Sequence, residues 1–383
     1  MQVLKDVNMI ERLASESINK VLDKGKACII MGARQVGKST LLKQMFGNRT
    51  DVLWLNGDEY DVRQMFESIT STRLRSIIGN NKIVIIDEAQ RIPDIGLKLK
   101  LITDQINDVR LIATGSSSFE LASKVNESLS GRKRELQMFP LTFREMTNHT
   151  SLIEELRMLP HRLVFGYYPE VVANAGDERD ILKELIGSYL YKDVLELESI
   201  KKSDKIIRLL QALALQIGSQ VSYNEIGRMI EFDSKTVEKY IDILEKCYIV
   251  FRLPSYARNL RNELKASRKV YFYDLGIRNA LISNFNPIEM RSQSEIGGMW
   301  ENFVISERMK FNAINGNDAR MYFWRTQQQN EIDLIEDNVG EISAYEFKWN
   351  PKAKVQSTKT FLNAYPEASF KVVSPENIDT FLI

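Results

Sequence analysis

Uninterrupted apolar runs mark the first part of the chain. Residues 27–31 and 83–86 are entirely apolar, and 109–114 form a third, mostly apolar run. Apolar runs of this length without polar alternation predict strands that are buried on both faces of a parallel sheet. Residues 39–45, directly after the first run, are predicted to form a helix. We therefore expect an α/β domain at this end of the chain.

The middle of the chain changes to helical periodicity. Apolar positions keep helical spacing from 204 to 218, and two shorter helices are predicted at 222–230 and 233–244, each with a capping residue at its start. The spacing of these two helices is typical of a helix-turn-helix. The segments 247–253 and 269–273 then predict the two strands of a wing.

These patterns predict four parts of the chain. The first domain ends between Pro140 and about Pro160, and a turn-rich aromatic stretch at 166–170 leads into helices. The predicted parts are an α/β domain at 1–150, a helical connector at 151–203, a winged-helix domain at 204–280 and an α/β C-terminal domain at 281–383.

A phosphate-binding motif lies between the first predicted strand and its helix. Residues 32–39 read Gly-Ala-Arg-Gln-Val-Gly-Lys-Ser and match the pattern GxxxxGK[ST]. Gly32 and Gly37 let backbone N–H groups turn toward phosphates, Lys38 reaches the β- and γ-oxygens, and the Ser39 hydroxyl is a magnesium ligand. A chance match is the alternative, but the strand and helix around the motif argue against it. The further residues predicted to contact ATP are Gln35, Val36 and Thr40.

The second apolar run ends in two carboxylates, Asp87 and Glu88. They follow a buried strand, at the sheet edge where α/β proteins bind ligands. Asp87 is expected to hold Mg²⁺ through water, and Glu88 to polarise an attacking water, which indicates hydrolysis of ATP. The alternative is a buried strand that runs into a solvated acidic turn.

Three other polar residues are weaker candidates for catalysis. Ser116 follows the third strand, where a hydroxyl can sense the γ-phosphate, although Gly-Ser clusters are also ordinary loop residues. Arg132 or Arg134 can neutralise charge in the transition state, in its own subunit or in a neighbouring one. A solvated basic turn is an equal alternative for these arginines.

The C-terminal third carries acids and a lysine that resemble the PD-(D/E)xK nuclease core. Asp333 lies on one predicted strand, Glu346 and Lys348 share one face of the next, and Glu301 lies on a helix before them. The resemblance implies that Asp333, Glu346 and Glu301 bind a metal ion and that Lys348 orients or deprotonates water. Acids that alternate with lysines are also common on solvated edge strands, and nuclease-like folds also occur as inactive binding modules.

Together the motifs resemble the prokaryotic AAA-type ATPases that carry a C-terminal domain of unknown function. The resemblance rests on residues 32–39, 87–90, 114–117, 131–132 and 140–145. It implies an additional-strand P-loop fold with a parallel sheet of order 5-1-4-3-2, in which residues 52–56 form strand two. It implies no substrate.

Composition fits an intracellular enzyme. Of 383 residues, 44% are hydrophobic and 27% are charged, and no apolar run is long enough to span a membrane. The N-terminus lacks the core of a signal peptide, so we expect a cytoplasmic protein. Cys28 and Cys247 lie apart in apolar segments and are expected to be reduced core residues. Zinc is not expected, because the chain has only 2 histidines.

The loop between the wing strands is rich in cations. It contains one acid, Glu263, beside the cations Arg258, Arg261, Lys265, Arg268 and Lys269. This excess of positive charge predicts contacts with phosphates. The second helix of the helix-turn-helix mixes acids with lysines, which disfavours direct reading of bases. Winged helices also dock proteins.

The sequence thus predicts an ATPase that uses ATP and Mg²⁺ and acts on nucleic acid, with DNA favoured over RNA and metal-dependent cleavage as an added activity. The alternative is an ATP-dependent switch whose nuclease-like domain is inactive and docks a protein. A homo-oligomer is needed if an arginine acts across a subunit interface, and no membrane partner is expected.

Overall fold

Five parallel strands form the sheet of the N-terminal domain. The computed structural model describes residues 9–116, 129–190, 203–257, 268–355 and 358–383. The sheet order is β2-β3-β4-β1-β5, which confirms the predicted order 5-1-4-3-2. The strands are β1 (Ala27–Met31), β2 (Val52–Asn56), β3 (Ile83–Asp87), β4 (Arg110–Gly115) and β5 (Lys133–Gln137).

Both faces of this sheet are buried, which explains the uninterrupted apolar runs. Along β1, Cys28 and Ile30 pack into one core cluster, whereas Ala27, Ile29 and Met31 pack into another. Successive side chains of a strand point to opposite faces, so each face needs its own apolar residues. The helical segments around the sheet are α1 (Ala14–Asp23), α2 (Lys38–Phe46), α3 (Tyr60–Glu67), α4 (Ser71–Ile78), η1 (Ala89–Arg91) and α5 (Ile95–Gln105).

The connector is helical, as predicted, and it packs against later parts of the chain. Tyr167 at its centre stacks on Phe303 with ring centroids 5.9 Å apart, and its hydroxyl donates to the buried Glu155 carboxylate at 2.7 Å. The connector therefore shares a core with the C-terminal region. Helix α7 (Phe143–His149) precedes the connector, whose described helical segments are α8 (Leu152–Phe165), α9 (Pro169–Ala173), α10 (Glu178–Glu184) and η2 (Leu185–Leu190).

The middle region contains the helices that the periodicity predicts, followed by a small antiparallel sheet of order β6-β8-β7. Ser222 and Asp233 cap α13 and α14 through their side chains, as expected. The strand predicted at 247–253 begins later, at Val250, because Cys247 is the C-cap of α14. We call the paired strands β7 and β8 the β7–β8 ribbon. The elements are α12 (Ser203–Leu215), β6 (Gln220–Val221), α13 (Tyr223–Ile230), α14 (Ser234–Lys246), β7 (Val250–Pro254), β8 (Arg268–Phe272) and α16 (Leu275–Leu281).

The C-terminal region is a second α/β unit with a sheet of order β12-β11-β10-β9. Strands β9, β10 and β11 are antiparallel neighbours, and β12 runs parallel to β11. A turn joins β10 to β11 at Val339 and Gly340, which both have positive φ. The elements are η3 (Ile288–Met290), α17 (Gln293–Asn315), β9 (Arg320–Arg325), β10 (Glu331–Asn338), β11 (Glu341–Phe347), α18 (Thr358–Ala364), β12 (Ser369–Val373) and α19 (Asp379–Leu382).

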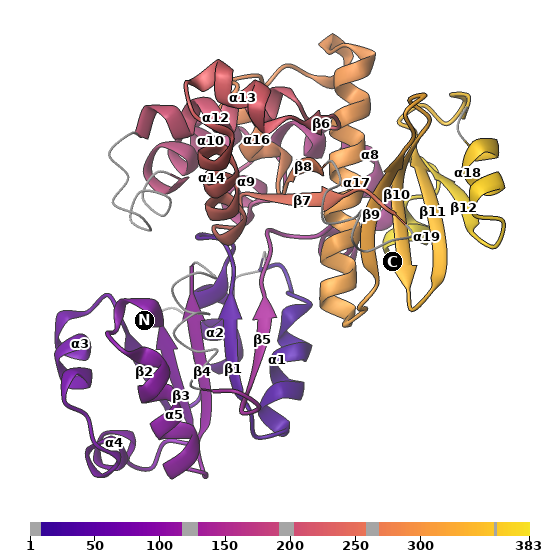
Figure 1. Ribbon diagram of the computed structural model, residues 1–383. Helices are drawn as coiled ribbons and strands as arrows, with labels where there is room; N and C mark the ends of the chain where they lie inside the picture. The colour runs from indigo at the N-terminus through magenta and orange to yellow at the C-terminus, as the bar shows by residue number, and fades with distance from the viewer. Residues whose placement is uncertain (1–8, 117–128, 191–202, 258–267, 356–357) are drawn as a thin grey trace.

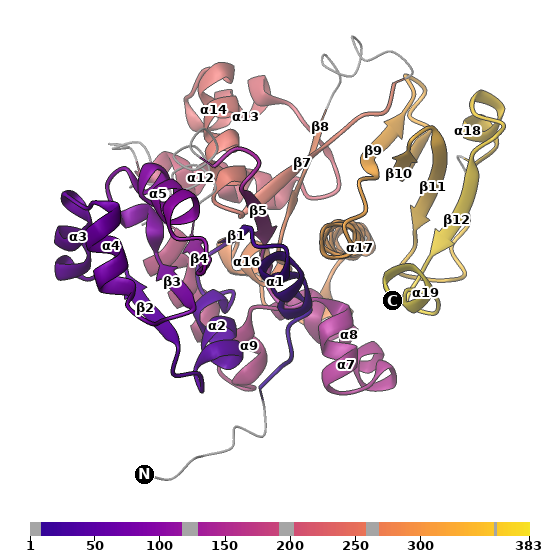
Figure 2. The ribbon, with the colours of Figure 1, turned by 90° about the horizontal axis from the view of Figure 1, so that it is seen from below.

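The long helix α17 lies between the β7–β8 ribbon and the C-terminal sheet (Figures 1 and 2). The ribbon also reaches the sheet directly, because the Tyr256 N–H donates to the Phe323 carbonyl at 2.6 Å. Within the ranges given above, no helix has both the length and the apolar character that crossing a bilayer requires.

Candidate functional site

The loop after β1 has the backbone shape that phosphate binding requires. A side chain on Gly32 would place its Cβ 2.0 Å from the Met138 carbonyl oxygen, so only glycine fits this position. Gly37 has a φ of 95° and leads directly into α2, whose first N–H groups face the loop. The buried Lys38 ammonium donates to the carbonyl oxygens of Gly32 and Ala33, each at 2.8 Å.

The groups predicted to bind magnesium are in contact. The Ser39 hydroxyl, at the start of α2, donates to Asp87 Oδ2 at 2.6 Å at the end of β3. Thr114, at the end of the neighbouring strand β4, donates to the other carboxylate oxygen of Asp87. The oxygen donors and their closeness fit a Mg²⁺ ion, which prefers such ligands. No pattern in the sequence marks this contact of Thr114, because β4 becomes a neighbour of β3 only in the sheet.

Glu88 is positioned by contacts on both its backbone and its side chain. It has a φ of 48°, and its N–H donates to the Thr114 hydroxyl at 3.1 Å. The Gln90 amide donates to Glu88 Oε2 at 2.6 Å and to the Ser116 hydroxyl at 3.1 Å. Ser116 therefore contacts the Glu88 carboxylate through Gln90, which the sequence analysis did not single out.

Lys38, Ser39 and Glu88 line a surface pocket at the carboxyl edge of the sheet. It is lined by Arg34, Gln35, Gly37, Lys38, Ser39, Thr40, Asp58 and Glu88. Arg34 and Asp58 were not predicted. Val36 was predicted as a contact, but its side chain is fully buried, so only its backbone can take part.

Arg12, a buried arginine before α1, binds the backbone of the phosphate loop. Arg12 donates to the Val36 carbonyl at 2.6 Å and to the Phe139 carbonyl at 2.7 Å, and it pairs with the buried Glu145 carboxylate at 3.0 Å. No motif in the sequence marks Arg12, because its partners follow it by 24 to 133 positions along the chain.

Arg132 lies at the opposite edge of the sheet from the phosphate loop. Its carbonyl accepts a hydrogen bond from the N–H of Ala27, the first residue of β1, whereas the loop follows the last residue of that strand. Its guanidinium pairs with Asp104 at 2.6 Å. Arg134, which pairs with Cys28 in the ladder, is also near that edge. This placement argues against an action of either arginine on the pocket of its own subunit. A solvated basic turn and an action on a neighbouring subunit are the two alternatives that stay open.

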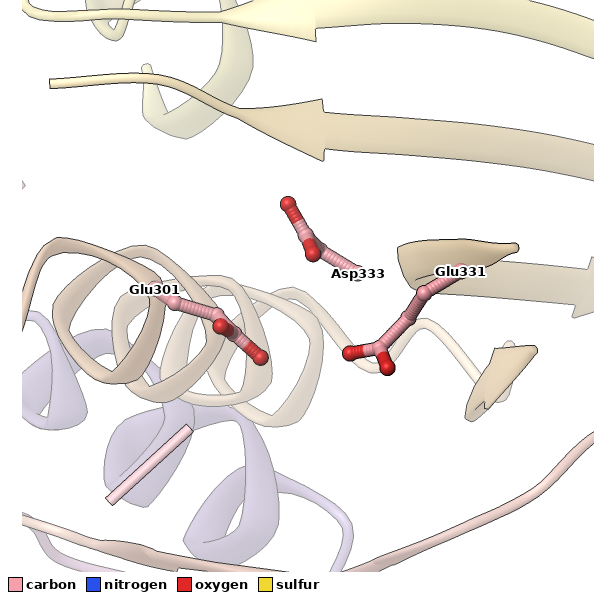
Figure 3. Close-up of side chains that lie close together, drawn as sticks. All are labelled: Glu301, Glu331 and Asp333. Carbon is pink, nitrogen blue, oxygen red and sulfur yellow. The ribbon is translucent and has the colours of Figure 1, made fainter. Parts of the chain in front are cut away.

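A second cluster of polar residues joins α17 to the C-terminal sheet. The carboxylates of Glu301, from α17, and of Glu331 and Asp333, from β10, point toward one another (Figure 3), and each offers an oxygen within 4.8 Å of the others. We call Glu301, Glu331, Asp333 and Glu346 the acidic centre. Three of its members were predicted, and Glu331 is an addition.

Glu346 joins this centre from the neighbouring strand. Leu334 pairs with Tyr345 in the β10–β11 ladder, so Asp333 and Glu346 are the next opposed residues. Glu346 Oε1 accepts from the Lys348 ammonium at 2.8 Å, while Glu346 Oε2 is buried and has no hydrogen-bond partner. Asp333 accepts from the Phe347 N–H at 2.7 Å.

Burial and the charges of neighbouring acids make the carboxyl groups of Asp333 and Glu346 hard to ionise. Burial raises the pKa of Asp333 well above its ordinary value, and the charges of Glu301 and Glu346 add to the shift. Burial also raises the pKa of Glu346, and Lys348 only partly opposes this. Buried carboxylates that lie this close together stay ionised only if a cation lies beside them.

Lys269 supplies one positive charge to the acidic centre. Lys269 of β8 was expected at the basic tip of the wing, and this was wrong. Its fully buried ammonium pairs with Glu301 at 2.7 Å and also with Glu331. The Tyr271 hydroxyl donates to the same Glu301 oxygen at 2.5 Å. The periodicity could not show this, because β8 and α17 meet only in the folded chain.

The rest of the basic tip is only partly visible. Arg258, Arg261 and Lys265 lie outside the described residues. Arg268 pairs with Glu238 of α14 at 3.5 Å and is partly exposed.

Comparisons with known families divide the chain into three matches. A family model described as an AAA domain matches residues 24–147. Two models described as domains of unknown function, DUF8612 and DUF4143, match residues 156–288 and 296–380. Together with the strand order and the phosphate loop, the first match identifies the N-terminal part as a P-loop ATPase domain of the AAA type.

Relatives span most of the chain. An uncharacterized protein of Mycobacterium tuberculosis is 25% identical over 343 residues, which cover 89% of this chain and 74% of that protein. An uncharacterized protein of Methanocaldococcus jannaschii is 28% identical over 315 residues, which cover 70% of this chain and 65% of that protein. Among solved structures, a Walker-type ATPase of Pyrococcus abyssi is similar with a TM-score of 0.51 and 16% identity, covering 73% of this chain and 97% of that one. At this identity the likeness is one of fold.

Proposed function

We propose that this protein binds and hydrolyses ATP in the pocket at the carboxyl edge of its five-stranded sheet, with Mg²⁺ as cofactor. The contact between the Ser39 hydroxyl and the Asp87 carboxylate, at 2.6 Å, carries the proposal. In P-loop enzymes a hydroxyl and an acid in these positions hold one Mg²⁺ ion. Ser39 and Asp87 would hold it here, and the bound ion neutralises charge on the β- and γ-phosphates.

The remaining residues of the pocket have separate tasks. The Lys38 ammonium would exchange its bonds to the Gly32 and Ala33 carbonyls for bonds to phosphate oxygens. The Glu88 carboxylate would orient the attacking water and take its proton. The Gln90 amide, which donates to both Glu88 and Ser116, would keep that carboxylate aimed at the water and report loss of the γ-phosphate through Ser116.

The test separates binding from hydrolysis. For Glu88→Gln we expect phosphate release to fall by about 100-fold or more, because a general base of this kind contributes about that much, while a fluorescent ATP analogue still binds. Lys38→Ala should lose binding of the analogue as well. Glu59→Gln, an exposed acid at the start of α3, is the matched control and should keep the wild-type rate. Wild-type protein that releases no phosphate with any nucleic acid or protein preparation would contradict the proposal.

We also propose that the ATPase acts on nucleic acid, DNA in preference to RNA. The order of elements in the middle region, two capped helices followed by the β7–β8 ribbon, supports a winged-helix arrangement. The cations Arg258, Arg261 and Lys265 between the ribbon strands would contact phosphates, with Arg268 beside them.

Salt dependence tests this partner. Replacing Arg258, Arg261 and Lys265 with alanine should weaken binding to all sequences alike and reduce the slope of log affinity against log salt by about 1 for each lost phosphate contact. A triple replacement of the exposed cations Lys20, Lys24 and Arg157 is the matched control. Binding that ignores salt, or a protein complex formed without nucleic acid, would favour the docking alternative instead.

Cleavage of nucleic acid is a second candidate function of the C-terminal region. Its helix, three antiparallel strands, helix and parallel strand support a PD-(D/E)xK nuclease-like fold, and the Glu346 oxygen without a partner favours a further ligand. Glu301, Asp333 and Glu346 would hold a divalent ion, and Lys348 would orient water. Incubation of plasmid, single-stranded DNA and RNA with Mg²⁺ or Mn²⁺, with and without ATP, should give cutting that Lys348→Ala abolishes. Absence of cutting in every condition would leave this domain as a docking module.

A further inference from the structure

A lysine from outside the C-terminal unit lies inside the acidic centre. Lys269 belongs to β8, which is hydrogen-bonded to β6 and β7 in the small sheet of the middle region. Its side chain is fully buried, and its ammonium pairs with Glu301 of α17 and with Glu331 of β10. Two parts of the chain are therefore joined by one buried cation.

The surroundings of the Lys269 ammonium suit a cation. Two carboxylates, those of Glu301 and Glu331, contact it inside the protein. The ammonium also lies 5.4 Å from the centre of the Phe323 ring, so an aromatic face covers it on another side. A buried ammonium is tolerated only with such partners.

Other cations balance the rest of the centre. Arg325 pairs with Glu331 at 3.3 Å, and Lys348 pairs with Glu346 at 2.8 Å. Within the part of the chain that the structure describes, the cations that pair with these carboxylates include Lys269, Arg325 and Lys348. A divalent ion held by Glu301, Glu331 and Asp333 would need carboxylate oxygens of the two residues, Glu301 and Glu331, with which the Lys269 ammonium pairs.

We propose that Lys269 is the resident cation of the acidic centre: its ammonium takes the position between Glu301 and Glu331 that a divalent ion would need, and the ion binds only when Lys269 withdraws. The inference rests on the second candidate function for Glu301 and Asp333 as metal donors, and it adds Glu331, whose carboxylate lies beside theirs. It adds that the centre is closed in the arrangement described above. Opening it requires β8 to move relative to α17, so the middle region controls access to the donors.

The test measures binding of Mn²⁺ alone by titration calorimetry, without nucleotide. Ser39→Ala is present in every sample, so that the phosphate loop contributes no metal ligand. Lys269→Met removes the ammonium and keeps an apolar stem of similar length. Lys310→Met is the matched control, because Lys310 is equally buried and pairs with Glu307 at 2.6 Å away from the acidic centre.

With Lys269 present we expect no measurable Mn²⁺ binding. Lys269→Met should bind Mn²⁺ at least about tenfold tighter than the weakest affinity that the titration detects, in the range by which metal sites respond to changes around their ligands. Asp333→Asn in the Lys269→Met background should abolish the gain, and Lys310→Met should show none. Mn²⁺ should also raise the melting temperature of Lys269→Met but not that of Lys310→Met.

Two results would overturn the proposal. The first is Mn²⁺ binding with Lys269 present that Asp333→Asn removes, since metal and ammonium would then share the centre. The second is a folded Lys269→Met that binds no Mn²⁺, since the ammonium would then not occupy a metal-binding position. If Lys269→Met does not fold, the sample with Lys269 present decides alone. Because the readout is metal binding, the inference and the cleavage function can fail separately.

Discussion

Single buried charges decide how the phosphate loop is held. Arg12 satisfies three acceptors at once, the carbonyls of Val36 and Phe139 and the carboxylate of Glu145. The same carboxylate also accepts from the N–H groups of Leu13 and Thr142. The loop backbone therefore depends on a residue that does not touch the pocket.

Replacing Arg12 with methionine should destabilise the protein strongly. We expect the free energy of unfolding to fall by about 3 to 5 kcal/mol, because Glu145 keeps a buried charge without its partner. Urea unfolding measures the loss, and Arg12→Met with Glu145→Gln should recover part of it. Lys20→Met, in an exposed pair with Glu16, is the control and should change stability by less than about 1 kcal/mol. An equally small change for Arg12→Met would contradict this account.

His161 predicts a pH dependence of stability. Burial lowers its pKa below the ordinary value of 6.5, and the nearby Glu178 carboxylate, 3.3 Å away, only partly opposes this. The unfolded chain therefore binds the proton more tightly than the folded one. The stability that this residue contributes is complete above 6.5 and is lost as the pH falls through 6.5 toward the lowered pKa.

Melting temperatures between pH 8 and 5, a range of about three units around the histidine pKa, check this. His161→Gln should flatten the decline on acidification. His149→Gln is the control, because the other histidine of the chain is exposed. An unchanged decline in His161→Gln would assign the effect to other groups.

At the scale of elements, the turn between β10 and β11 aligns the two strands that carry Asp333 and Glu346. Val339 is fully exposed in this turn with a φ of 53°, a region that β-branched residues avoid. Gly340 follows with a φ of 94°, and its N–H donates to Asp337 Oδ1 at 2.8 Å. The turn thus combines one favourable residue with one strained residue.

Val339→Asn should stabilise the protein. We expect a gain of about 0.5 to 1 kcal/mol in the free energy of unfolding, because asparagine tolerates positive φ and valine loses no contact on replacement. Gly340→Ala should have the opposite effect and lower the free energy of unfolding by about 1 kcal/mol or more, because alanine tolerates positive φ less well than glycine. Both are measured by urea unfolding. A loss of stability in Val339→Asn would show that the valine has a packing role.

At the scale of the whole molecule, β8 runs between the two candidate sites. Tyr273, directly after this strand, stacks on Phe139 with ring centroids 6.0 Å apart. Met138, the neighbour of Phe139, approaches Gly32 of the phosphate loop and donates its N–H to Met31. Lys269, near the other end of β8, enters the acidic centre. A single strand therefore contacts the surroundings of both sites.

We expect nucleotide binding to change the protection of β8. In hydrogen exchange with a slowly hydrolysed ATP analogue, the amides of residues 269–273 should exchange at a different rate than without it. Phe139→Ala should remove most of this difference, while the analogue still binds, because the stacked contact is lost. Equal exchange with and without the analogue in the wild type would show that the two sites are independent.

The fold of the N-terminal domain and the place of its phosphate loop could be read from the sequence. Short apolar runs without alternation are typical of strands that are covered on both faces, and the glycines and lysine of 32–39 have few other uses between a strand and a helix. The strand order followed from the resemblance and was confirmed. Ser39 was predicted from its place in the phosphate-binding motif, and Asp87 and Glu88 from their place at the end of an apolar run. The structure brings Ser39 and Asp87 into contact.

Only the tertiary structure decided which side chains support these residues and what fills the acidic centre. Arg12, Thr114 and Gln90 have no pattern of their own, because their partners come from strands and loops that meet only after folding. Lys269 belongs to a cation-rich stretch, and its sequence neighbours suggested an exposed tip. The alternation of a strand says which residues share a face, but not which other element covers that face, and for Lys269 the cover is the acidic centre.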